Sequence, residues 1–140
     1  MFVTPGNGQG NGTILITGAI GDLGTTHGFR VHGQAFAYAT LRHGKIEFNL
    51  TKVAAKANSA SPKIDAATCS AAISVSAPVS VVGGTGLYKG VSGTVNLTES
   101  IGYIGATYTT GSKKGQCNMS NSAPTVGQVA SVHGTGTVRF

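Results

Sequence analysis

Short stretches in which apolar and polar residues alternate one by one limit the possible folds of this chain more than any other feature. From Ala71 to Val81, every odd position is apolar and every even position is alanine, serine or proline. From Lys45 to Thr51, three large apolar residues alternate with polar ones. Successive side chains of a β-strand point to opposite faces, so both stretches are predicted to be strands with one buried face.

The rest of the chain repeats this pattern in pieces that are separated by turn residues. Further strands are predicted at residues 13–20, 34–41, 91–97, 101–109 and 126–140. A tight turn after residue 41 would join the strand at residues 34–41 to the strand at residues 45–51 in a hairpin. Residues 53–63 form either a short helix or a long loop. Pro78 has no backbone N–H, so we expect it at a bulge or at an edge-like position of its strand.

Together these elements predict an all-β protein. Glycine is the commonest residue, at 22, and supplies the turns and bulges between the strands. We expect a single antiparallel β-barrel of about eight strands, closed or nearly closed, because long strands with open edges promote aggregation. The last strand would pair with the first. Residues 13–140 would form the barrel domain and the polar, glycine-rich residues 1–12 a flexible N-terminal arm.

The charge pattern argues against two classes of partner. The formal net charge is +6, but it arises from having only four acids, and the ten Lys and Arg residues are scattered. A nucleic-acid site usually shows clustered bases with interleaved aromatic residues, so we expect no nucleic-acid binding. No apolar run approaches the roughly 18 residues of a membrane span, so none is expected.

Cys69 and Cys117 are the only cysteines. Two cysteines in a chain rich in serine, threonine and glycine favour one disulfide in a secreted or extracytoplasmic protein, and the polar start of the chain fits a mature protein without its export signal. The alternative is two buried thiols in a cytosolic protein. Neither the cysteines nor the four histidines have the spacing of metal ligands, so no metal or other cofactor is expected.

The stretch from Gly83 to Gly93 is the most distinctive motif of the chain. It lacks the spacing of a phosphate-binding loop, and a strand follows it in place of a helix, which argues against a nucleotide site. Its glycines would allow positive φ angles and a sharp reversal between two strands. Tyr88 would then fold over the turn.

This stretch resembles the allene oxide cyclase and dirigent protein family and its small exported bacterial relatives, as do Thr17 to Thr25 and the position of Cys69. The resemblance implies an eight-stranded antiparallel barrel with a hydrophobic cavity, often assembled as a homo-oligomer. It also implies steering of reactive, largely apolar intermediates without a cofactor, as in a cyclase.

Four residues are candidates for a ligand site at one mouth of the barrel. Tyr38, Tyr88 and Tyr103 each lie on or beside a predicted strand and combine an apolar ring with a hydroxyl group. Glu99 continues the alternation of Val95 and Leu97, so an unbroken strand would direct it into the apolar face, where it could act as a catalytic acid or base. Otherwise the strand ends at residue 98 and Glu99 is solvated, and the tyrosines cover the outside of the barrel or a subunit interface.

These observations favour a barrel that binds a small hydrophobic molecule in its lumen. If the barrel is an enzyme, we expect it to be a cofactor-free cyclase. The first alternative is an exported structural or interaction protein whose barrel is filled and has no catalytic activity. A carbohydrate-binding module is a second alternative, which the absence of tryptophan disfavours. Inward alanine and glycine leave room for a ligand, whereas inward leucine, isoleucine and phenylalanine fill the lumen.

Overall fold

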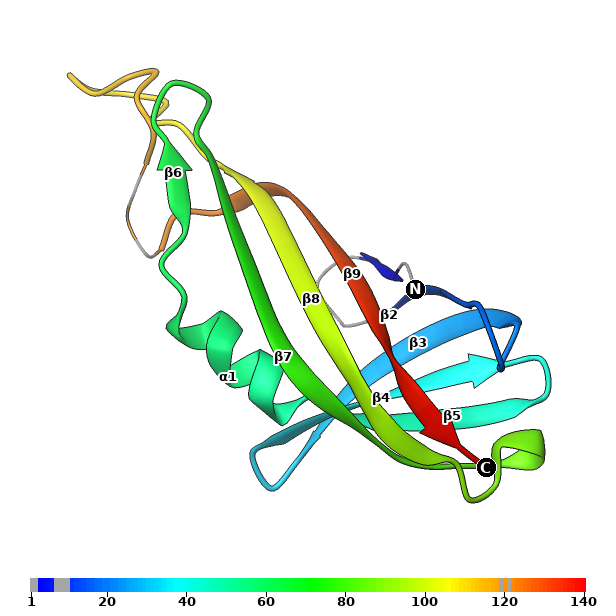
Figure 1. Cartoon of the computed structure of the whole chain (residues 1–140). Helices are drawn as coiled ribbons and strands as arrows, with labels where there is room; N and C mark the ends of the chain where they lie inside the picture. The colour runs from blue at the N-terminus through cyan, green and yellow to red at the C-terminus, as the bar shows by residue number, and fades with distance from the viewer. Residues whose placement is uncertain (1–2, 7–10, 119, 121) are drawn as a thin grey trace.

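A computed structural model describes residues 3–6, 11–118, 120 and 122–140 of the chain. Figure 1 shows a strongly twisted antiparallel sheet with the α-helix α1 beside it. The strands are β1 (Val3–Gly6), β2 (Asn11–Ile16), β3 (Asp22–Val31), β4 (Gln34–Leu41), β5 (Gly44–Asn49), β6 (Lys63–Asp65), β7 (Ser70–Gly84), β8 (Ser92–Gly105) and β9 (Thr125–Arg139). The helix α1 spans Thr51–Ser59, and the 3-10 turn η1 spans Gly86–Tyr88.

The sheet curls into a barrel. Its strand order is β5-β4-β3-β2-β1-β9-β8-β7-β6, and β5 also pairs with β7, so all strands but β6 form a ring. Every pairing between strands is antiparallel. The first and last strands of the chain meet where Val3 pairs with Val132. The predicted all-β class and the antiparallel barrel are therefore confirmed. The last strand was expected to pair with the strand at residues 13–20, but it pairs with β1, which lies within the expected N-terminal arm and separates β9 from β2.

Two strand boundaries differ from the prediction. The first long strand was expected to extend to residue 20, but β2 ends at Ile16 and the chain turns through residues 17–21. The two strands expected between residues 91 and 109 are one continuous strand, β8. Its partner β7 is one residue longer. The ladder between the two strands extends from Ser70 to Val81 of β7 without interruption, which keeps β8 extended through its polar middle.

The core fills most of the barrel interior. The largest fully buried side chains are Ile14, Ile46, Val79 and Val91. They come from β2, β5, β7 and the turn before β8, and they belong to one cluster that also contains Tyr88. The predicted inward faces of residues 45–51 and 71–81 are thus the faces that bury Ile46, Phe48 and Val79.

Pro78 lies at the edge-like position that its missing N–H predicts. β7 pairs with β6 at residues 70–72 and with β5 at residues 80–84, and between them its outer edge has no strand partner in the described chain. Helix α1 covers this interval, and Lys56 Nζ donates a hydrogen bond of 2.8 Å to the carbonyl of Ser76. Of the two structures considered for residues 53–63, the short helix is the one that forms.

Beyond the barrel, the start of β7, the end of β8 and the start of β9 project from it (Figure 1). We call this projection the arm, and it is separate from the N-terminal arm expected at residues 1–12. A disulfide between Cys69 and Cys117 ties the start of β7 to the loop between β8 and β9, as predicted. In the expected N-terminal arm, residues 3–6 and 11–12 belong to β1 and β2, while residues 1–2 and 7–10 lie outside the described residues. Among the described helices, none is long and apolar enough to cross a membrane.

Candidate functional site

Two turns contact each other at the end of the barrel opposite the arm. The glycine-rich turn between β7 and β8 folds onto the turn between β4 and β5, where the Leu87 N–H donates to the carbonyl of His43 at 2.9 Å. The Thr85 N–H donates to the carbonyl of Lys45, also at 2.9 Å. Gly86 has φ +63°. The reversal predicted for residues 83–93, with a left-handed glycine and Tyr88 folded over it, is confirmed.

Asp22 is the hydrogen-bonding centre of this end. It is buried, with 4 % of its surface exposed, although it is the first residue of β3. The Tyr88 hydroxyl donates to Asp22 Oδ2 at 2.6 Å, and the Leu23 N–H donates to Oδ1 at 2.8 Å. His43 Nδ1 lies 3.1 Å from Oδ2. One carboxylate therefore joins three segments that are far apart in the sequence.

The pKa values of Asp22 and Tyr88 follow from this arrangement. The hydrogen bond from Tyr88, helped by those from Leu23 and His43, holds the pKa of Asp22 well below its usual range, although burial opposes this. Burial and the facing carboxylate raise the pKa of Tyr88 to about 12. At neutral pH Asp22 is thus ionised and Tyr88 is neutral, which is the state in which their hydrogen bond forms.

We expect the stability of the protein to depend on Asp22 below about pH 5. A carboxyl group whose folded pKa lies below its unfolded value of about 3.9 stabilises the fold above that value, and the stabilisation is lost as the pH falls toward the folded pKa. Melting temperatures measured between pH 7 and pH 2 should therefore fall less steeply for Asp22→Asn than for the unmodified protein.

Asp65→Asn is the matched control for this experiment. The pKa of Asp65 is also lowered, mainly by the N–H of Ala67. This variant keeps Asp22 and should retain most of the acid-dependent loss. Equal slopes for Asp22→Asn and the unmodified protein would contradict the assignment of the pH dependence to Asp22.

A cavity of about 300 Å³ lies in the lumen near the same end of the barrel. Most of its wall is apolar, and no lining residue in the described chain carries an ionisable side chain. The lining residues come from the β2–β3 turn, the sheet interior and β9: Ile16, Thr17, Gly18, Ala19, Ile20, Ile46, Phe48, Val81, Val95, Gly134, Gly136, Thr137 and Val138. The sequence did not predict that residues 17–20 form a turn that lines a cavity, because these residues were expected to continue a strand.

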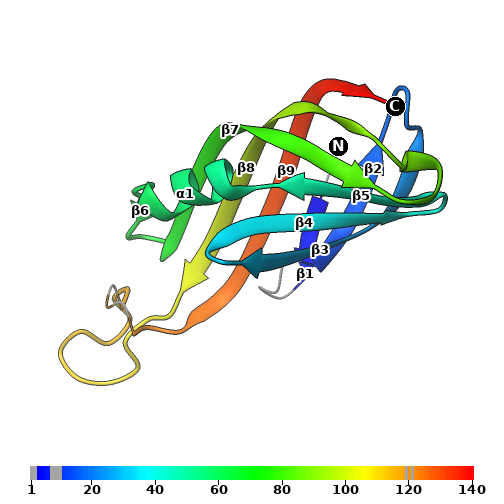
Figure 2. The same ribbon diagram turned by 90° about the horizontal axis from the view of Figure 1, so that it is seen from below.

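Residues 16–20 and the part of β9 from residue 134 to residue 138 lie on two sides of the cavity, and we call the space between them the lateral slot. β1 lies between β2 and β9 in the ring. It pairs with β2 at residues 11–14 and with β9 at Val132. Both β2 and β9 contribute residues to the wall of the cavity, and Figure 2 shows β1 between these two strands.

Glu99 lies on the inward face of β8. The strand continues to Gly105, so Glu99 has the same orientation as Val95 and Leu97, and it pairs with Val75 and Val132. Burial in these surroundings raises its pKa. The alternative in which the strand ends at residue 98 is wrong. However, Glu99 is not among the residues that line the lumen cavity.

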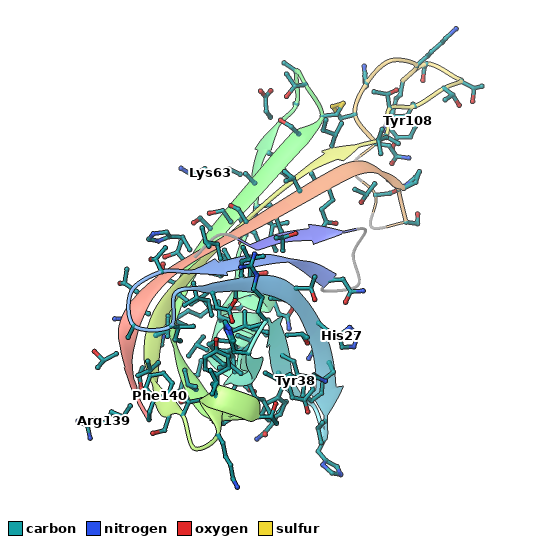
Figure 3. All side chains as sticks on the ribbon, turned by 90° about the vertical axis from the view of Figure 1, so that its right-hand side faces the viewer. His27, Tyr38, Lys63, Tyr108, Arg139 and Phe140 are labelled. Atoms are coloured by element: carbon teal, nitrogen blue, oxygen red, sulfur yellow. A yellow bond between two sulfur atoms is a disulfide. The ribbon has the colours of Figure 1, made fainter. Side chains whose placement is uncertain are left out.

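The three candidate tyrosines lie in different parts of the molecule. Tyr38 neighbours the buried Ala39 on β4 and therefore faces outward, where its ring stacks on Phe29 with centroids 4.6 Å apart. Tyr88 is in the core. Tyr103, on the arm, lines a separate cavity of about 390 Å³ beside the disulfide. Figure 3 shows Tyr38 on the barrel, far from the arm tip that carries Tyr108. The structure does not bring the tyrosines together at one mouth.

Comparisons with known proteins identify no relative of this chain: no family model, no curated protein and no solved structure matches it. Among the described residues, no group of three or more His, Cys, Asp or Glu side chains is placed to hold a metal ion. The lumen cavity, its lateral slot and the Asp22 cluster are therefore the features from which a function has to be inferred.

Proposed function

We propose that this protein binds a small hydrophobic molecule in the lumen of its barrel. The observation that carries the proposal is the cavity of about 300 Å³ with its largely apolar wall. Ligand sites in proteins are typically concave, mostly apolar and about 300–1,000 Å³ in volume, so this one suits a ligand at the small end of that range. The sequence resemblance to the allene oxide cyclase and dirigent proteins supports the same proposal.

The mouth of the cavity adds a few polar groups to the apolar wall. Thr17 and Thr137 contribute hydroxyl groups, and both are exposed at the slot. A site of this kind binds through burial of apolar surface, at about 25 cal/mol per Å², and uses its polar groups to orient the ligand. We place this binding protein outside the cytoplasm, because the Cys69–Cys117 disulfide is of the kind that persists in oxidising compartments.

Cyclase activity and a homo-oligomeric state stay predictions from the resemblance. Glu99 is the acidic group expected to act as acid or base, and its raised pKa suits such a role. Its position away from the lumen cavity gives it no contact with a ligand bound there. The proposal is therefore restricted to binding.

The alternative, a filled barrel that serves as a structural protein, has one observation in its favour. Apart from the cavity, the interior is packed by the buried cluster around Ile14, Ile46 and Val79. In this alternative the cavity is a packing defect that binds nothing specifically.

Binding of a neutral apolar fluorophore, N-phenyl-1-naphthylamine, separates the two functions. We expect saturable binding with a 1:1 stoichiometry to the unmodified protein. Ala19 is an exposed residue on the rim of the cavity, so Ala19→Trp should cover the entrance. We expect this substitution to weaken binding at least about tenfold, equivalent to roughly 1.4 kcal/mol.

Thr135→Trp is the matched control, because it adds the same side chain to the exposed outer side of β9. It should leave binding of the fluorophore unchanged. Thermal melts should show that both variants are folded. Absence of saturable binding, or equal weakening by both substitutions, would refute the lumen site and favour the filled barrel.

A further inference from the structure

The turn between β2 and β3 is a thin wall of the lumen cavity. Four consecutive residues of this turn, 17–20, line the cavity. Three of them, Thr17, Gly18 and Ala19, are at the same time exposed to solvent. On this side, a single layer of chain therefore separates the cavity from water.

Few contacts hold this turn in place. None of residues 17–21 forms a hydrogen bond with another segment of the described chain, whereas hydrogen bonds join the two neighbouring turns at this end of the barrel. A Cβ at Gly18 would meet no atom within 4 Å, and one at Gly21 would meet only the carbonyl oxygen of Gly18, at 3.6 Å. Ile20 is the residue through which the turn packs against the buried cluster. A segment with so few hydrogen bonds and buried contacts opens at a low cost in free energy.

The base of the turn, in contrast, is fixed. Ile16 pairs with Asp22 in the ladder between β2 and β3, and the Tyr88 hydroxyl holds the buried carboxylate of Asp22 at 2.6 Å. Between these ends, Gly18 and Gly21 have φ angles of +80° and +55°. Glycine can leave such a conformation without steric resistance from a side chain, so both positions can act as hinges.

From this arrangement we infer that residues 17–21 form a lid, which controls the entry and exit of the ligand. The inference rests on the proposed function, because it concerns access to the same cavity. In the closed form, which the structure shows, Ile20 packs against the core and the turn covers the cavity. In the open form, the turn swings outward, Ile20 leaves the core and the lateral slot widens. Lids of this kind move in microseconds to milliseconds and can limit the rate of binding and release.

Stopped-flow fluorescence with N-phenyl-1-naphthylamine tests this inference on the full chain. Gly18→Ala adds a methyl group where there is open space, so it removes no contact, but it makes the φ of +80° unfavourable. The open lid does not need this φ, so the substitution raises the open fraction. We expect the association and dissociation rate constants both to rise about fivefold, and the Kd to change less than about twofold.

Gly90→Ala is the matched control for this variant. Gly90 has a similar φ, +83°, and a Cβ there would also meet no atom within 4 Å. It lies between η1 and β8 and does not line the cavity. The substitution should leave both rate constants unchanged.

A second pair of variants tests the contact that keeps the lid closed. Ile20→Ser removes the packing of the turn against the core, so we expect the association rate constant to rise about fivefold or more. The dissociation rate constant should rise further, because Ile20 also lines the cavity. Val138→Ser is the matched control, because Val138 likewise lines the cavity and packs against the core, but it belongs to β9. It should raise the dissociation rate constant and leave the association rate constant unchanged.

The outcomes separate the inference from the proposed function. An unchanged association rate constant in folded Gly18→Ala or Ile20→Ser would overturn the lid and leave the binding site in place, because the fluorophore would still bind. A similar rise in the association rate constant of either control would also overturn it, because entry would then depend on general loosening of the barrel. If the unmodified protein shows no saturable binding, the proposed function and the lid are refuted together.

Discussion

Replacement of Gly86 by alanine is expected to lower the free energy of unfolding by about 3 kcal/mol or more. Gly86 has φ +63°, a region that L-residues other than Asn and Asp seldom adopt, and this strain alone costs about 1 kcal/mol or more. A Cβ at this position would also lie 2.3 Å from the carbonyl oxygen of His43 and 3.0 Å from Gly44 Cα. Because backbone atoms cannot rotate away, the two turns would have to separate. Denaturant unfolding monitored by circular dichroism measures the loss.

Gly90→Ala is the matched control for this experiment. Gly90 has a similar φ, +83°, but a Cβ there would meet no atom within 4 Å. The substitution should therefore cost only the backbone strain, about 1 kcal/mol. The difference between the two variants isolates the contact between the two turns. Equal losses for Gly86→Ala and Gly90→Ala would show that this contact does not contribute to stability.

The second large effect is expected at the disulfide. The double variant Cys69→Ala/Cys117→Ala removes the bond, whose cysteines are separated by 48 residues. In the chain-entropy model, a loop of this length closed in the unfolded state stabilises the fold by about 4 kcal/mol. For a domain of this size, such a loss lowers the melting temperature by roughly 10 °C. Equilibrium unfolding of the oxidised protein and the variant under the same conditions measures it.

Reduction of the unmodified protein is the control for this prediction. It breaks the same bond without changing a side chain elsewhere, so it should give a loss similar to that of the double variant. A larger m-value is also expected in both cases, because an unfolded chain without the cross-link exposes more surface. A loss below about 1 kcal/mol in the double variant would contradict the entropic account.

Several features of the fold were predictable because they depend on neighbouring residues. The alternation of Ile46 and Phe48 identifies the buried face of β5, whichever strands lie beside it. The missing N–H of Pro78 restricts it to an unpaired edge. The glycines of residues 83–93 indicated the reversal and the positive φ of Gly86. In each case the reason lies within a few residues of chain.

The candidate site was less predictable, because its parts come together only through strand pairing. No role for Asp22 follows from its neighbours in the sequence. The pairing of β3 with β4 places it beside His43, and the turn after β7 brings the Tyr88 hydroxyl to it. Tyr38 was a candidate because it combines an apolar ring with a hydroxyl group. It is adjacent to the buried Ala39 on β4, and neighbouring residues of a strand point to opposite faces, so Tyr38 points outward. The two alternatives for Glu99 differed in the length of one strand, and that length depends on the β7 ladder.

By itself, the sequence determined the all-β class, the inward faces of the main strands and the sharp reversal at Gly86. For the two cysteines it left two alternatives open, one disulfide or two buried thiols. Only the tertiary structure decided that Cys69 and Cys117 pair, that Asp22 joins three segments, and that β1 lies between β2 and β9 in the barrel. The physical reason is that residue alternation and glycine conformation are local properties of the chain. Closure of the barrel depends on the register between distant strands, which neither property specifies.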